Sequence, residues 1–199
     1  NPNPCVHASG LLNLAWIRLQ QAERTPGTGH EAIHEALRRG EALVAAGDCR
    51  REEALPFLLN TVRTLQLDHA WPAANAELDR LARVLRDGDD PALHAEFQLL
   101  RARQLLAAGE FAAARVSLTA PVAWDDLPDE LALEWMLALG EVAEARGADS
   151  EAFGFYQRAH RRTVDRLQGE IARLKQQLAE KELEIDRLKA ELLRSYPKP

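Results

Sequence analysis

The sequence predicts an all-α fold in which a series of helix pairs is followed by one long C-terminal helix. The chain has 34 Ala and 32 Leu but only 8 Val and 4 Ile, and Ala and Leu favour helices where β-branched residues favour strands. Apolar residues recur at helical spacing up to about residue 163, and a heptad pattern follows. With 199 residues, 46% of them apolar, the chain can bury a sizeable core.

The first predicted helix pair starts near residue 9, after an N-terminal extension over residues 1–8. Its first helix carries the small residue Ala15 among apolar neighbours, and its second runs from about His30 to Ala46. The connecting segment is rich in Pro, Gly and Thr, which is typical of a loop.

The next two helix pairs are predicted to start near residues 51 and 91. A break over Asp68 to Pro72 separates the two helices of the second pair. The third pair contains a glycine and several small or apolar residues, namely Ala102, Gly109, Ala114 and Leu118. The same spacing of such residues occurs in the fourth pair.

The fourth pair, starting near residue 128, has the clearest pattern of small and large residues. Small residues let two helices approach closely at their crossing, and a large residue fills the adjoining gap. Gly147 is expected to end the first helix in a left-handed conformation. The residues of this pattern are Leu139, Gly140, Gly147, Ala152, Tyr156 and Ala159.

These residues resemble the tetratricopeptide repeat (TPR), and the resemblance extends over residues 9–163 as about four helix pairs. It implies a solenoid of antiparallel pairs in which the first helix of each pair lines a groove that binds a protein or peptide. An irregular helical bundle is the alternative. The groove positions that the resemblance implies are Leu12, Trp16, Leu59, Arg63, Leu99, Arg103, Leu137 and Glu141.

Residues 164–195 are predicted to form a parallel, two-stranded coiled coil between two copies of the chain, with a short tail over residues 196–199. Mostly β-branched a positions with Leu at d favour this arrangement, and Glu170 and Glu184 at g face Lys175 and Lys189 at e of the partner. A helix that folds back as a cap on its own repeats is the alternative. The predicted dimerisation residues are Val164, Leu167, Ile171, Leu174, Leu178, Ile185, Leu188 and Leu192.

One motif is associated with catalysis. His30, Glu31 and His34 form an H-E-x-x-H pattern, which on a helix can bind zinc and activate a metal-bound water. It falls in the first turn of a predicted helix, and Leu37 replaces the glycine of the longer metzincin pattern. We therefore predict neither an enzyme nor a bound cofactor, and keep a zinc hydrolase as an alternative in which Glu52, Glu53 or Cys49 would be the third ligand.

Charge and hydropathy exclude other classes. The net charge of −6 argues against broad binding of nucleic acid, and no segment has the roughly 18 consecutive apolar residues of a membrane helix. Cys5 and Cys49 are predicted to be reduced thiols in a cytoplasmic protein, with a single disulfide in an exported protein as the alternative.

The sequence thus predicts a non-catalytic interaction and dimerisation module, or a purely structural scaffold. The unbroken passage from the last helix pair into the heptads also resembles the sensory region of bacterial signalling proteins. In those proteins TPR arrays lead through a helical stalk into an output domain, such as a diguanylate cyclase, a kinase or a DNA-binding domain.

Overall fold

The computed structural model describes residues 3–24, 30–47, 49–119 and 127–195, and these residues form helices and no strands. Within this part of the chain, no helix combines the length and apolar character needed to cross a membrane. The helices are α1 (Pro4–Arg24), α2 (Glu31–Ala46), α3 (Arg51–Leu67), α4 (Trp71–Val84), α5 (Pro91–Ala107), α6 (Phe111–Leu118), α7 (Asp129–Ala145) and α8 (Asp149–Ser195).

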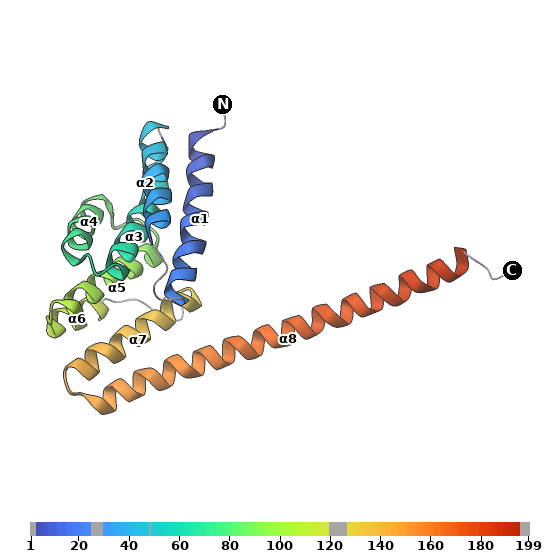
Figure 1. Cartoon of the computed structure of the whole chain (residues 1–199). Coiled ribbons are helices and arrows are strands. Elements are labelled where there is room, and N and C mark those ends of the chain that lie inside the picture. The colour runs from blue at the N-terminus through green and yellow to red at the C-terminus, as the bar shows by residue number, and fades with distance from the viewer. Residues whose placement is uncertain (1–2, 25–29, 48, 120–126, 196–199) are drawn as a thin grey trace.

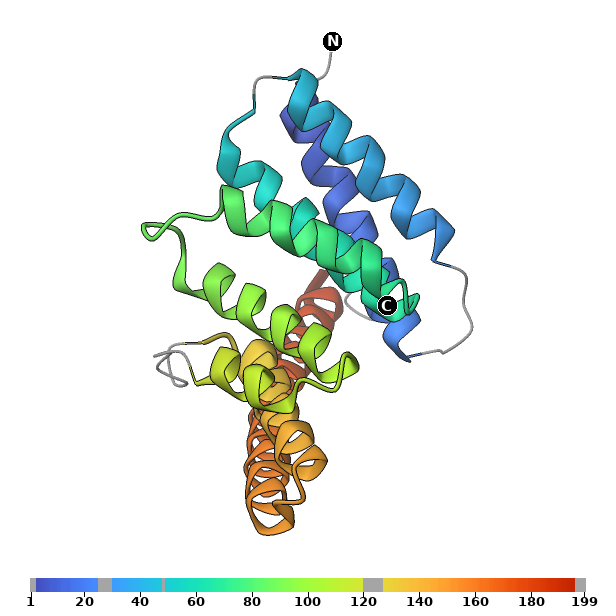
Figure 2. The same cartoon turned by 90° about the vertical axis from the view of Figure 1, so that its left-hand side faces the viewer.

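Consecutive helices form four pairs, α1 with α2, α3 with α4, α5 with α6 and α7 with α8. The first helices of neighbouring pairs also pack on one another, α1 on α3, α3 on α5 and α5 on α7, as the two views show (Figures 1 and 2). Helix α1 begins at Pro4, so most of the extension predicted over residues 1–8 is helical. The reason is that Ala8 is buried against α2 and Cys5 is anchored to Cys49.

Two glycines, Gly140 and Gly40, allow close helix contacts because they have no Cβ atom that would clash with a ring on the next helix. A Cβ atom on Gly140 of α7 would lie 2.4 Å from Cε1 of Tyr156 in α8, and one on Gly40 of α2 would lie 2.1 Å from Cε1 of Phe57 in α3. Gly147 ends α7 with a φ of 72°, the left-handed conformation that its position predicts. Small residues therefore set the approach of α7 to α8, as expected from the sequence.

Cys5 and Cys49 form a disulfide, so the prediction of reduced thiols is wrong. The bridge joins the first turn of α1 to the segment just before α3, because α1 packs on both α2 and α3. The cytoplasmic localisation was argued from reduced thiols and loses that support, since lasting disulfides are typical of oxidising compartments.

Helix α8 continues for 47 residues and projects from the body of the molecule (Figure 1). Its first turns pack on α7 through Ala152, Phe155 and Ala159, whereas residues 165–192 are exposed. The helix therefore does not fold back as a cap on its own repeats. The predicted tail over residues 196–199 lies outside the described residues.

Candidate functional site

Cavities lie along the face of the molecule formed by the first helices of the pairs. One, of about 640 Å³, is lined from α3, α4, α5, α6 and α7, and we call it the α3–α7 cavity. A smaller one of about 200 Å³ is lined by residues that include Trp16, Arg63 and Glu134. A third of about 220 Å³ lies between α1, α3 and α5 and is lined by residues that include Leu12, Trp16 and Leu59. The first two cavities share Arg63 and the last two share Trp16, so together they form a discontinuous groove.

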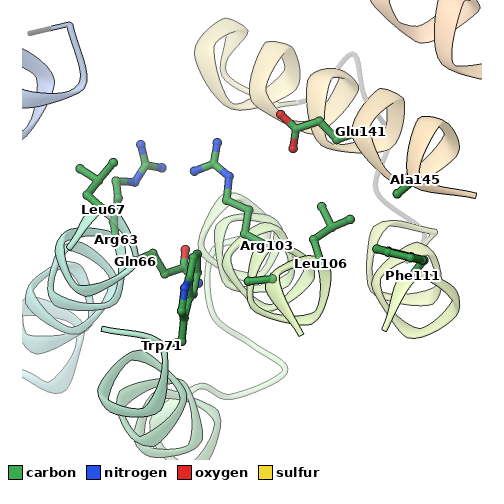
Figure 3. A pocket seen from close by; sticks show the side chains of 10 residues that line it. Arg63, Gln66, Leu67, Trp71, Arg103, Leu106, Phe111, Glu141 and Ala145 are labelled. Carbon is green, nitrogen blue, oxygen red and sulfur yellow. The ribbon is translucent and has the colours of Figure 1, made fainter. Parts of the chain in front are cut away.

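The α3–α7 cavity combines an apolar wall with a few polar groups (Figure 3). The guanidinium groups of Arg63 and Arg103 and the carboxylate of Glu141 face the same space, and the Trp71 ring lies on the α4 side of it. Its size falls in the range of about 300–1,000 Å³ that is common for ligand pockets. The residues that line it are Arg63, Gln66, Leu67, Trp71, Arg103, Leu106, Ala107, Phe111, Glu141 and Ala145.

An ion-pair network around one buried arginine borders this cavity. Arg63, whose side chain is 4% exposed, donates to Glu96 Oε1 at 3.2 Å and to Glu134 Oε1 at 3.1 Å. Arg103 donates to the other oxygen of Glu134 at 3.2 Å, and the Arg63 guanidinium also lies 5.5 Å from the centre of the Trp16 ring. The network ties α1, α3, α5 and α7 together at the floor of the groove.

Burial raises the pKa of Glu96, although the charge of Arg63 opposes this effect. Removing one member of such a network leaves a buried charge without its partner, which is strongly destabilising. The network therefore has a structural role, and Arg63 is engaged within the protein rather than free to orient a ligand.

Predicted groove residues fall into three groups. Leu12, Trp16, Arg63, Arg103 and Glu141 line the cavities. Leu59 also lines one but is 2% exposed, and Leu99 is fully buried in the core against α6 and α7, so its placement in the groove is wrong. Leu137 is 39% exposed and lies on α7 between Glu134 and Glu141.

Several residues of this surface were not predicted from the sequence. Glu134 precedes Glu141 by seven residues, and Glu96 precedes Arg103 by the same interval, so the helical period could have placed each on the groove-facing side of its helix. Trp71 and Phe111 begin the second helices of their pairs, α4 and α6, and the resemblance assigned those helices no part in the groove.

The H-E-x-x-H histidines meet an unexpected partner. His30 Nδ1 bonds one oxygen of Asp68, and His34 Nε2 lies 2.6 Å from the other oxygen. Burial alone would raise the pKa of Asp68, but the hydrogen bonds and charges of the two histidines outweigh it and hold this pKa below its ordinary value. The carboxylate thus connects the start of α2 to the end of α3.

Neither Cys49 nor Glu53 is placed to complete a zinc site with these histidines. Glu53 accepts from the backbone N–H of Arg50 at 3.2 Å, and Cys49 is in the disulfide. Among the described residues, the group whose ligand atoms lie close enough together to share a metal ion is Cys5, Cys49 and Glu53. Both sulfur atoms of that group are bonded to each other, so they are not thiolate ligands in this structure.

Comparison with known proteins adds no assignment. No family model, curated protein or solved structure matches the chain. The TPR resemblance therefore depends on the residues given above and on nothing outside this chain.

Proposed function

We propose that this chain is a non-catalytic interaction module that forms a parallel homodimer through α8 and binds a partner protein or peptide in the groove. In this proposal the module is the sensory part of a larger bacterial signalling protein, as its stalk-like helix suggests. The observation that carries the proposal is the apolar stripe on the part of α8 that projects from the body.

The stripe is exposed from Leu167 to Leu192, whereas the first predicted seam residue, Val164, is half-buried. Its large members are between 47% and 62% exposed, namely Leu167, Ile171, Leu174, Leu178, Ile185, Leu188 and Leu192. Isolated helices are marginally stable in water and need an apolar partner surface. A second copy provides one in register, because Glu170 then faces Lys175 and Glu184 faces Lys189 across the interface.

The chain contains a matched control for this proposal. Leu183 lies on the same helix and is 72% exposed, yet it occupies an outer position of the heptad. Replacing both Leu174 and Leu188 with Asp should convert the dimer into a monomer, because two charges would enter the seam of each helix. Leu183→Asp should leave the dimer intact.

The measurement is molar mass by light scattering during size-exclusion chromatography at micromolar concentration. A monomeric wild-type chain, or equal masses for the seam and control variants, would refute the dimer. A Leu188→Cys variant tests the orientation, since oxidation should link two copies only if the helices run parallel and in register.

Binding in the groove is the second part of the proposal. It is supported by three cavities along α1, α3, α5 and α7, of which two share Arg63 and two share Trp16. Apolar pockets with a few convergent polar groups are typical of binding sites.

A further inference from the structure

The charges around the α3–α7 cavity do not balance. Its lining contains the cations Arg63 and Arg103 and the carboxylate of Glu141, and the two arginines are paired with Glu96 and Glu134. Two cations thus stand against three carboxylates. Among the described residues, Glu141 has no ion-pair partner and is exposed, so one negative charge remains at the mouth of the cavity.

A second acceptor lies in the same wall. Gln66 is 7% exposed, and its Nε2 donates to the carbonyl oxygen of Leu100 at 2.8 Å. Because that carbonyl can only accept, the amide orientation is fixed and Oε1 is the other atom of the group. Within the described part of the chain, this buried oxygen has no hydrogen-bond partner. Gln66 Oε1 therefore lacks a donor, and the exposed Glu141 carboxylate at the mouth is free to accept from one.

The remaining wall suits an apolar stem. Trp71, Leu106 and Phe111 also line the cavity, Trp71 on the side of Gln66 and the other two on the side of Ala145. An aromatic face attracts a cation as well as an alkyl chain, and long basic side chains carry their charge on an apolar stem. A volume of about 640 Å³ leaves room for such a side chain and the backbone next to it.

From these observations we infer that the α3–α7 cavity binds a basic side chain, lysine or arginine, of the partner protein. This inference rests on the proposed function, because it takes the groove as the binding surface. The donor group meets Glu141 and Gln66, and the stem lies along Trp71. Arg63 and Arg103 are like charges in the same lining, and their bonds to glutamates reduce their repulsion of the ligand.

The test measures binding of single amino acids with blocked termini to the full chain, from changes in NMR chemical shifts. N-acetyl-lysine-N-methylamide should bind at least five times more tightly than its uncharged analogue with norleucine, and the corresponding glutamate compound should not bind. Glu141→Gln should weaken lysine binding about tenfold, the usual effect of a hydrogen bond to a charged group. Glu31→Gln, an equal charge change on the exposed side of α2, should leave binding unchanged.

The Arg103→Gln variant distinguishes a site for a cationic ligand from a site for an anionic one. The inference expects tighter binding of the lysine compound, because a repulsive cation is removed while Glu134 keeps Arg63 as its partner. Preference for the glutamate compound, lost in Arg103→Gln, would overturn the inference and identify an anion site. Butylamine binding as tightly as the capped lysine would overturn the assignment to a protein partner and identify a small amine.

This outcome is separable from that of the proposed function. The cavity is lined by residues between 63 and 145, whereas the seam of the stalk begins at residue 164. The lysine compound could fail to bind while the chain is still a dimer and still binds a peptide without a basic side chain in the groove. That result would refute the inference and leave the proposed function standing. A monomer that binds the lysine compound removes the proposed dimer alone.

Discussion

Replacing Gly40 with Ala tests whether the close approach of α2 to α3 is required. The added Cβ would lie 2.1 Å from Cε1 and 2.6 Å from Cζ of Phe57, well inside the carbon–carbon contact distance of about 3.5–4.0 Å. Phe57 is 1% exposed and packs in the core of α1 and α2, so its ring has no free space to enter. Overpacking of this kind costs about 1–3 kcal/mol.

The substitution also has a favourable contribution. Ala is better than Gly in a helix interior by about 1 kcal/mol. Since the contact is severe and the ring is confined, we expect the upper end of the overpacking range and a net loss of about 2 kcal/mol. Urea denaturation followed by circular dichroism measures this loss, with all variants at one protein concentration.

Gly10→Ala is the matched control. Gly10 lies inside α1, and a Cβ there would meet no atom within 4 Å. This variant should therefore gain about 1 kcal/mol, and the two variants should differ by about 3 kcal/mol. If Gly40→Ala were as stable as Gly10→Ala, the packing of Phe57 against α2 would be wrong.

Other predictions concern the disulfide and the carboxylate beside the two histidines. Replacing both Cys5 and Cys49 with Ser should lower the free energy of unfolding by about 4 kcal/mol, from the chain entropy of a loop of 44 residues. Denaturation with and without a dithiol reductant measures this loss. The stability of the Ser variant should not change on addition of the reductant. Asp68 has a lowered pKa in the folded state, so its stabilising contribution is present above its unfolded pKa and is lost as the pH falls through the folded value. Asp68→Asn should therefore destabilise the protein at neutral pH and reduce its loss of stability on acidification. An unchanged pH dependence in denaturation experiments would contradict the bonds to His30 and His34.

The first residue of a helix could be predicted from the sequence where nearby residues favour a helix start. Pairs predicted to start near residues 51, 91 and 128 begin at Arg51, Pro91 and Asp129. At Pro91 the signal is direct, because Asp90 caps the helix through the N–H of Ala92 and proline suits the first turn. The start of α1 was missed because the extra turns at Pro4 are held by contacts with α2 and by Cys49, which are distant in sequence.

The site was harder to predict because its groups come from separate helices. Arg63 lines two of the cavities, but its charge is paired with those of Glu96 and Glu134, which lie 33 and 71 residues away. The contacts of Asp68 with His30 and His34 are similarly distant, at 38 and 34 residues. Helical periodicity identifies the face on which a residue lies, but it does not identify the partner on another helix.

Helix α7 connects the groove to the stalk. One of its faces carries Glu134 and Glu141, and on another Gly140 receives Tyr156 of α8. Asp129, at its first residue, accepts two bonds from Arg162 of α8 at 2.7 and 3.1 Å. Because α8 then continues without a break, a ligand that shifts α7 also shifts the helix that holds the proposed dimer seam. A dimer should therefore couple its two grooves through the stalk.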